Sequence, residues 1–346
     1  MTGFSVALAG AGAIGRAHAA TLKSLDGFAL AGIADPTEAG KQYANALGVP
    51  WFDDIPHLLA SARPDAVIVA TPNQTHMPIA VQALEAGIPV LVEKPVASTV
   101  AEGLAIAEAS ERTGVPTLVG HHRRHNPIIR RAREILAAGD LGEVTNVTIL
   151  SAFFKPDDYF AAEWRRKPGG GPILINLIHE IDLVRHLCGE IRTVHAVSSS
   201  RVRNSEVEDS AAVLLHLENG ALATISLSDT AVAPWAWDLS AGESSNYPPQ
   251  PRPLNAHFIS GTKASLTLPQ LELWQYGGRK SWFEPIAVEE LEVHRSNPYA
   301  SQLLHLREVA EGKSLPLVSA GDATKTLQAT LAVSEAARTG RPVSLH

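Results

Sequence analysis

The sequence predicts an α/β protein of two domains, in which a doubly wound parallel sheet precedes an α+β domain built on a mostly antiparallel sheet. In the first third of the chain, short apolar runs rich in β-formers alternate with helical stretches. After Gly120 the expected strands follow one another more closely. The 346 residues also exceed what one hydrophobic core usually holds. We therefore expect domains at 1–120 and 121–346.

The N-terminal domain is predicted from its alternating elements. Three of its expected helices end near a glycine, namely Gly48, Gly87 or Gly114, which is a common signal for a helix C-terminus. Strands that alternate with helices imply a parallel sheet covered on both faces. The expected strands are 4–9, 28–34, 66–70, 89–92 and 117–119, and the expected helices are 13–24, 37–47, 75–86 and 99–113.

The C-terminal domain is predicted from closely spaced strands. The turn Glu218-Asn219-Gly220 separates two alternating runs and carries a hairpin signal. An antiparallel sheet with helices on one face follows from this pattern. The expected strands are 191–200, 210–217, 221–228, 257–268, 271–276 and 285–293, and the expected helices are 127–138, 172–187, 298–311 and 322–338.

Composition excludes several classes of partner. The net charge of -7 lacks the basic footprint of a nucleic-acid-binding protein, and no apolar run is long enough to span a bilayer. No positively charged segment precedes the short apolar run at the N-terminus, so we expect no signal peptide and a cytoplasmic location. The single cysteine, Cys188, lies in an apolar helical pattern and is interpreted as a packed small hydrophobic residue rather than a reactive thiol.

A glycine-rich motif predicts a dinucleotide site. Gly10-Ala11-Gly12-Ala13-Ile14-Gly15 follows the first strand and opens the first helix, and Asp35 ends the second strand about twenty residues later. Gly10 permits the tight turn, Gly12 lets the backbone approach the pyrophosphate, and Gly15 allows close packing of helix on strand. The alternative, an ordinary strand-to-helix turn, does not account for the strand, the helix and Asp35 together. This is the fingerprint of a Rossmann domain.

Asp35 also predicts which cofactor is bound. Its carboxylate should accept hydrogen bonds from the adenosine ribose hydroxyls, whereas a 2′-phosphate would meet a like charge. No Arg or Lys stands at 36–38 to offset that charge. NAD is therefore favoured over NADP.

Two further segments follow strands at the edge where open α/β sheets bind ligands. They are Thr71-Pro72-Asn73-Gln74-Thr75-His76 and Glu93-Lys94-Pro95. Taken alone, the first is also explained by a helix cap with Thr75 at the N-cap, and the second by a surface ion pair of Glu93 and Lys94. The expected cofactor contacts are Gly10, Gly12, Ala13, Ile14, Gly15, Asp35, Thr71, Pro72, Asn73, His76, Glu93 and Lys94.

Together with two later motifs, these residues resemble the glucose-fructose oxidoreductase and inositol dehydrogenase (Gfo/Idh/MocA) family over nearly the whole chain. The resemblance implies a Rossmann domain, an open, mostly antiparallel sheet domain and an active site between them. It also implies that Lys94 and His179 are catalytic. The motifs are GAGAIG with Asp35, TPNQTH at 71–76, EKP at 93–95, GHHRR at 120–124, and GGG at 169–171 leading to His179 and Asp182.

One position departs from the family pattern. Many members have an aspartate four residues before the catalytic histidine, where this chain has Ile175. The nearest polar residue is Asn176, which shares a helix face with His179 and Asp182. The proton route is therefore left open by the sequence.

The implied chemistry is hydride transfer from a secondary alcohol carbon to the nicotinamide while the hydroxyl loses its proton. His179 titrates nearest neutral pH and is the preferred base, with Lys94 orienting and polarising the oxygen. The two roles are interchangeable if the nicotinamide and desolvation favour the neutral lysine. The structural alternative for His179 is a helix histidine satisfied inside the core.

A basic segment, His121-His122-Arg123-Arg124-His125, follows the fifth strand. It is either a solvated basic start to a helix or a segment in which His122 or Arg124 faces the substrate, which would suit an acidic sugar or a hydroxylated cyclic carboxylate.

The loop 233–253 is rich in proline and aromatic residues and is expected to shape the substrate pocket. Arg165, next to Trp164, is a weaker candidate. The expected substrate contacts are Lys94, His122, Arg124, Trp164, Asn176, His179 and Trp235.

The leading function is NAD-dependent oxidation of a secondary alcohol in a sugar, cyclitol or related hydroxylated, possibly carboxylated, small molecule. A second hypothesis is a glycosidase-like or epimerising enzyme that holds and regenerates its NAD. A third is a non-catalytic NAD-binding regulator. No metal site is expected. We expect a homodimer or homotetramer formed through the C-terminal sheet.

Overall fold

The computed structural model describes residues 3–243, 247–248 and 250–345, which form two compact units. Unit 1 contains the chain up to His125 together with Ser296–Leu327. Unit 2 contains Asn126–Arg295 and the chain from Gln328 onwards. Within these described residues, no helix combines the length and apolar character needed to cross a membrane.

Unit 1 is built on a six-stranded parallel sheet in the order β3-β2-β1-β4-β5-β6. The order reverses between β1 and β4, which is where doubly wound sheets bind nucleotides. The predicted Rossmann architecture is therefore confirmed. The strands are β1 (Phe4–Ala9), β2 (Phe28–Ala34), β3 (Trp51–Phe52), β4 (Ala66–Val69), β5 (Val90–Val92) and β6 (Thr117–Val119).

Helix ends in unit 1 follow local side-chain chemistry. The Thr37 side chain accepts a hydrogen bond from the Gly40 N–H at the start of α2, and Thr99 with Glu102 forms a capping box at the start of α5. The helices are α1 (Ala13–Ser24), α2 (Glu38–Leu47), α3 (Ile55–Ala62), α4 (His76–Glu85), α5 (Val100–Thr113) and α9 (Pro298–Ala310), and α10 (Ala320–Thr339) crosses the boundary between the units.

Two elements of unit 1 are absent from the predicted set. β3 has only two residues, too few to show a periodicity. The helix α3 has readable signals, since Asp54 caps it and Pro56 stands in its first turn. α9 belongs to unit 1, where its Leu303 and Leu306 are part of the hydrophobic core that also contains buried side chains of β1.

Unit 2 is built on a nine-stranded sheet in the order β14-β13-β12-β11-β7-β10-β9-β8-β15. Its described pairings are antiparallel except for β7 with β10, which run parallel. The strands are β7 (Val144–Ala152), β8 (Ile191–Ser199), β9 (Ser210–Leu217), β10 (Leu222–Ser228), β11 (His257–Gly261), β12 (Ala264–Leu268), β13 (Glu272–Tyr276), β14 (Ile286–Glu290) and β15 (Val343–Ser344).

The structure corrects the predicted strands in three places, one of which is the two-residue strand β15, too short to show a periodicity. β7 is not predicted, because its buried positions include Ser151 beside Val147 and Ile149, which weakens the apolar alternation. The single strand expected at 257–268 is two antiparallel strands, with the turn around Thr262 between them.

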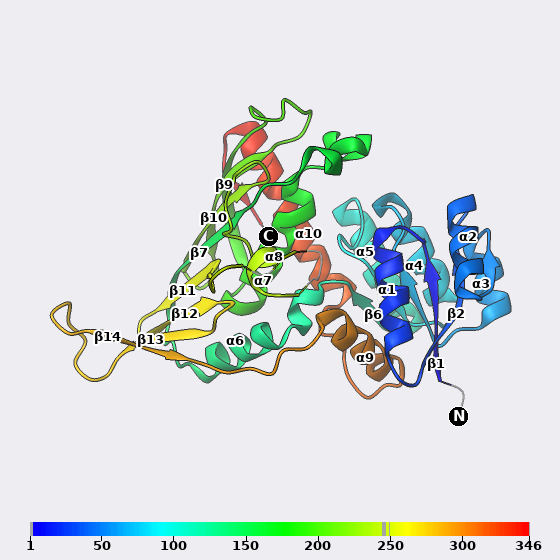
Figure 1. The fold of residues 1–346 in the computed structure, drawn as a ribbon, viewed down its shortest axis with the longest axis horizontal. Helices are drawn as coiled ribbons and strands as arrows, with labels where there is room; N and C mark the ends of the chain where they lie inside the picture. The colour runs from blue at the N-terminus through cyan, green and yellow to red at the C-terminus, as the bar shows by residue number, and fades with distance from the viewer. Residues whose placement is uncertain (1–2, 244–246, 249, 346) are drawn as a thin grey trace. The chain divides into compact units, whose positions relative to one another are not determined.

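The core of unit 2 lies on one face of its sheet. α6 (Pro127–Ala138) and α7 (Ile178–Cys188) cover that face, as Figure 1 shows. A π-helical turn, Ile173–Leu177, leads directly into α7. Cys188 is buried in this core, and burial raises the pKa of its thiol to about 12, in agreement with a packing role.

Candidate active site

The glycine motif forms a tight turn between β1 and α1. Gly10 has a φ of 93°, a left-handed conformation that favours glycine. A Cβ on Gly15 would lie 2.0 Å from the Gly10 carbonyl oxygen, so a side chain there would push the helix off the strand. A Cβ on Gly12, the N-cap of α1, would meet no heavy atom of the described chain within 4 Å. This open helix N-terminus fits the pyrophosphate of a dinucleotide.

Asp35 is fixed as a carboxylate at the end of β2. One oxygen accepts the Ala11 N–H at 2.8 Å, and the other accepts the Thr37 N–H at 2.9 Å and its hydroxyl at 2.5 Å. Burial raises the pKa of Asp35, but the bonds from Thr37 and Ala11 outweigh burial, and the pKa lies below its usual value. The site therefore fits a ribose diol, which donates hydrogen bonds to such an oxygen.

Arg16 is a cation beside Asp35 that lies outside the predicted set. Its Nε donates to the Ala11 carbonyl at 2.9 Å, and its guanidinium lies 4.3 Å from the centre of the Tyr43 ring. Its charge also lowers the pKa of Asp35. It comes from α1, about twenty residues before Asp35, so the residues next to Asp35 in the sequence give no sign of it.

The segment after β4 is tied to the segment after β5 by His76. Its buried ring places Nδ1 2.9 Å from the Pro95 carbonyl oxygen and Nε2 2.9 Å from the Thr71 carbonyl oxygen. Burial lowers the pKa of His76, although both carbonyls act in the opposite direction. Thr75 is the N-cap residue of α4, but its hydroxyl lies 2.8 Å from the Pro72 carbonyl instead of capping the helix. The predicted contacts Thr71, Pro72 and Asn73 thus lie on a braced loop.

Glu93 is buried, so the alternative of a surface ion pair with Lys94 is wrong. Its Oε1 lies 2.7 Å from His18 Nε2, and its Oε2 accepts the Lys94 backbone N–H at 3.2 Å. A Cβ on Gly120 would lie 2.8 Å from Oε1, so a side chain there would displace the Glu93 carboxylate. His18 lies outside the predicted set, although its position three residues after Gly15 places it on the same helix face.

The charge of Glu93 is maintained by its surroundings. Burial raises the pKa of Glu93, but the hydrogen bond from His18 and the charge on His18 outweigh burial. Positive charge at His122 and Lys94 lowers the pKa further, so the pKa lies below its usual value. A carboxylate in this place stabilises the ammonium form of the half-buried Lys94.

The basic segment is not solvated, because its five residues from His121 to His125 are all buried. Arg124 donates to the Asp322 carboxylate at 2.6 Å within unit 1. The His122 ring stacks on the Tyr299 ring with centroids 4.3 Å apart. The solvated start to a helix is therefore excluded, and Arg124 has a carboxylate partner in α10.

In unit 2, the residues predicted around His179 lie on the π-helical turn and α7. Ile175 and Asn176 are half-buried in the π-helical turn, while His179 and Asp182 are buried in the first turns of α7. π-helical turns are rare in proteins, and many of those that occur are found at functional sites. Asn176 accepts a hydrogen bond at 2.5 Å from Lys155, a buried lysine outside the predicted set.

The aromatic candidates of unit 2 are exposed. Trp164 and Trp235 are 55% and 48% accessible, and the Arg165 guanidinium lies 3.8 Å from the centre of the Tyr159 ring. The loop predicted at 233–253 contains the buried Trp237, but its residues 244–246 and 249 lie outside the described residues.

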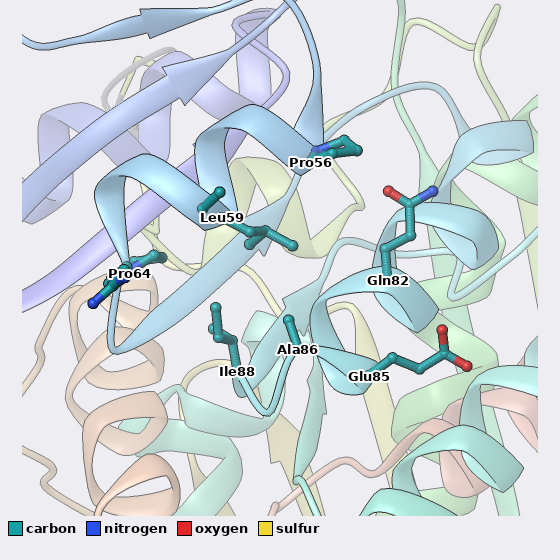
Figure 2. A pocket seen from close by; sticks show the side chains of 9 residues that line it. Pro56, Leu59, Pro64, Gln82, Glu85, Ala86 and Ile88 are labelled. Carbon is teal, nitrogen blue, oxygen red and sulfur yellow. The ribbon is translucent and has the colours of Figure 1, made fainter.

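A surface pocket of about 640 Å³ lies elsewhere in unit 1 (Figure 2). Leu59 of α3 and Gln82 of α4 line it, together with Pro64 and Ile88, which precede β4 and β5. The pocket is therefore at the amino ends of these strands. Thr71, Glu93 and Lys94 follow the carboxyl ends, so this pocket is not the candidate active site.

Comparisons with known proteins agree with this arrangement. Residues 4–121 match the model of the oxidoreductase family with an NAD-binding Rossmann fold, and residues 129–267 match the GFO/IDH/MocA C-terminal domain. The chain is 28% identical to the scyllo-inositol 2-dehydrogenase (NAD⁺) of Bacillus subtilis, over 98% of this chain and 95% of that protein.

A second relative is the 4-carboxy-2-hydroxymuconate-6-semialdehyde dehydrogenase of a Sphingobium species, 31% identical over 64% of this chain and 71% of that protein. The fold is also that of the WlbA dehydrogenase of Chromobacterium violaceum, with a TM-score of 0.80 and 23% identity over 100% of this chain and 97% of that one. The glycine turn and the ionised Asp35 agree with the NAD-binding fold of these proteins. The two family models and these relatives show that this chain belongs to the GFO/IDH/MocA family of NAD-binding oxidoreductases.

Proposed function

We propose that this NAD-dependent oxidoreductase, which acts on CH–OH groups, oxidises a secondary alcohol of a sugar, a cyclitol or a related hydroxylated small molecule. The observation that carries the proposal is the edge of the unit 1 sheet, where the glycine turn and Asp35 occur with a lysine braced by a buried carboxylate. The relatives named as inositol 2-dehydrogenases and D-apiose dehydrogenase support this substrate class.

The residues of unit 1 fit NAD. The N–H groups at the start of α1 would hold the pyrophosphate, and Asp35 would accept the ribose hydroxyls. The predicted contacts from Thr71, Pro72, Asn73 and His76 lie at the same sheet edge. Bound NAD⁺ supplies the hydride acceptor.

Lys94 and His179 divide the work on the substrate hydroxyl in this proposal. The Glu93 carboxylate favours the charged form of Lys94, which then donates a hydrogen bond to the hydroxyl oxygen and stabilises negative charge developing there. His179 takes the hydroxyl proton on an imidazole nitrogen. The reverse assignment, with Lys94 as the base, requires a neutral lysine beside Glu93 and is less favourable.

The predicted substrate contacts stay part of the proposal. His122 is stacked on Tyr299, Arg124 is paired with Asp322, and Asn176 is bonded to Lys155, so all three are held in place inside their own units. The exposed Trp164 and Trp235 complete the set.

A substrate screen tests the function. Purified enzyme with NAD⁺ is given aldoses, cyclitols and sugar acids, and NADH is followed by its absorbance. Net NADH formation with at least one of them is expected. An enzyme that regenerates its cofactor would instead release an altered substrate with no net NADH, and a non-catalytic regulator would bind NAD⁺ and change nothing.

We also propose that the protein is a cytoplasmic homo-oligomer assembled through the unit 2 sheet. The face of this sheet opposite the core carries a row of exposed apolar side chains. Such patches are uncommon on monomers. The row consists of Val197, Leu214, Leu222, Phe258, Trp274 and Val288.

A further inference from the structure

A polar cluster lies at one edge of the unit 2 sheet, and the family resemblance assigns no role to it. β7 and β10 are parallel neighbours, so the chain leaves both at the same edge. Lys155 follows β7 and Asp229 follows β10, and the Lys155 N–H donates to the Asp229 carbonyl at 2.9 Å. Lys155 and Asp229 are both buried.

Arg203 is the tighter ionic partner of Asp229. Its Nε donates to the Asp229 carboxylate at 2.9 Å, and the same guanidinium donates to the carbonyls of Asp229 and Lys155 at 2.7 Å each. The Lys155 ammonium is farther from the Asp229 carboxylate, at 4.0 Å. Asp229 therefore makes its closer ionic contact with Arg203, and the Lys155 ammonium also lies 4.9 Å from the centre of the Tyr159 ring.

The ammonium is bonded to a neutral group on the segment that leads to His179. Lys155 Nζ donates to Asn176 Oδ1 at 2.5 Å. Because the oxygen of the carboxamide faces the ammonium, the amide N–H bonds point away from it. Asn176 and His179 are three residues apart, and such residues are neighbours on a helix. Lys155 therefore orients Asn176 as a donor of hydrogen bonds on the π-helical turn that leads into the helix of His179.

We propose that Lys155 and Asn176 recognise a carboxylate on the substrate, so that the enzyme prefers a hydroxylated carboxylic acid to the neutral polyol of the same stereochemistry. The amide N–H groups and the adjacent ammonium together favour an anionic acceptor over a neutral one. Ile175, the residue before Asn176, carries no charge that would repel this group. The inference rests on the proposed function and names its substrate class.

Matched substrate pairs test the inference. The pairs are D-gluconate with D-sorbitol and D-glucuronate with D-glucose. Wild-type enzyme is expected to prefer the acid in at least one pair. Lys155→Met should lower kcat/KM for that acid by about tenfold to a hundredfold, the scale of a charge-assisted hydrogen bond, and change the neutral partner by less than about threefold. Lys155→Arg should restore part of the loss.

Asn176→Asp is a sharper variant, since it keeps the size of the side chain but replaces the two amide N–H groups with an oxygen that pairs with Lys155. It should remove the preference for the acid while keeping the fold, as shown by the thermal unfolding midpoint. The matched control is Lys263→Met, an exposed lysine of the same unit, which should leave both members of each pair unchanged.

A binding measurement separates this inference from the proposed function. Calorimetry on NAD⁺-loaded enzyme gives the affinity for each acid and each neutral partner without turnover. Tighter binding of an acid that weakens at least tenfold in Lys155→Met supports the inference even if no NADH forms, in which case the proposed function fails alone. Equal affinity for acids and neutral partners in wild type, or equal losses for both in Lys155→Met, overturns the inference, whereas NADH formed from neutral polyols would still support the function.

Discussion

At the scale of single residues, we expect Asp35 to control the choice of cofactor. Hydrogen bonds from Ala11 and Thr37 hold its carboxylate ionised, so the 2′-phosphate of NADP⁺ would meet a fixed negative charge. We expect kcat/KM to be at least tenfold higher with NAD⁺ than with NADP⁺, equivalent to about 1.4 kcal/mol. Asp35→Ser combined with Pro36→Arg should shift the ratio towards NADP⁺. Comparable values for the two cofactors in wild type would contradict the assignment.

Arg16 provides the control for this prediction. Its guanidinium already lies beside Asp35, so it can contact a 2′-phosphate once the carboxylate is removed. Adding Arg16→Ala to the double variant should therefore reduce its gain with NADP⁺. If the gain is unchanged, Pro36→Arg alone provides the new contact.

The proposed catalytic pair, Lys94 and His179, gives the second prediction. Lys94→Ala and His179→Ala should each lower kcat by about a hundredfold or more, the usual scale for positioned acid–base groups, with much smaller changes in NAD⁺ affinity. The double variant should lose less than the product of the two single losses, since both residues serve one step. His179→Ala with near-normal kcat, measured where chemistry limits the rate, would remove His179 from the mechanism.

Glu93 gives a prediction for pH. Its pKa is lowered in the folded protein, so its charge stabilises the fold above the ordinary glutamate pKa of 4.5, and this contribution is lost as pH falls below 4.5 towards the lowered value. Glu93→Gln should lower the free energy of unfolding at pH 7 by about 1 to 3 kcal/mol and flatten its decline between pH 5 and about 3. Urea unfolding across this range measures both effects, and parallel pH curves for variant and wild type would disprove the role.

At the scale of elements, the sequence predicts best where the local pattern and the final environment agree. β1, the glycine turn and α1 are predicted because the apolar run, the three glycines and the acidic residue after β2 are all read locally. The π-helical turn before α7 is not predicted, because an extra residue in a helical turn leaves no periodic signal. Lys155 and His18 are also missed, since their partners Asn176 and Glu93 are distant in sequence.

The short 3₁₀ helix His122–His125 carries a prediction at this scale. Arg124 is 5% exposed and its partner Asp322 is 30% exposed, so the pair ties this helix to α10. Arg124→Ala should lower the free energy of unfolding by about 2 kcal/mol, measured by urea denaturation, since Asp322 would lose a charged hydrogen bond.

Kinetics of the same variant distinguish the two roles of Arg124. If Arg124 contacts a substrate carboxylate, KM should rise far more for sugar acids than for neutral polyols. A similar change for both substrate classes would leave it only the role of holding the 3₁₀ helix. The matched control is Arg131→Ala, an exposed arginine of α6 that pairs with Glu134.

At the scale of the whole molecule, unit 1 is discontinuous in sequence. Tyr299 and Asp322, which contact His122 and Arg124, come from the segment Ser296–Leu327 that follows unit 2 along the chain. Helical periodicity predicts α9 and α10, but the local sequence does not indicate which hydrophobic core they pack against. Local patterns therefore predict the residues at the sheet edge of the candidate site, but they do not predict that Tyr299 and Asp322 contact His122 and Arg124.

The last prediction concerns assembly through the outer face of the unit 2 sheet. Strand register places Phe258 opposite Thr148, and Trp274 opposite Val288. On the other side of β7, Thr148 is also opposite Thr224 of β10. Leu222 lies two residues before Thr224 and therefore on the same face. The exposed apolar side chains thus lie on one face of the sheet, with threonine and serine side chains between them, and burying this face against a second copy removes apolar surface from water. Wild type should be a dimer or tetramer at micromolar concentration by light scattering.

Charge on that face should weaken the assembly. Trp274→Lys with Phe258→Lys places like charges across the interface and should raise the dissociation constant at least a hundredfold, the equivalent of about 2.7 kcal/mol, without lowering the thermal midpoint of the monomer. Leu315→Lys is the matched control, because Leu315 is 86% exposed and belongs to unit 1 instead of the unit 2 sheet. A wild-type monomer at micromolar concentration would contradict this prediction. A double variant that assembles as wild type does would also contradict it, because the apolar face would then not be the interface between copies.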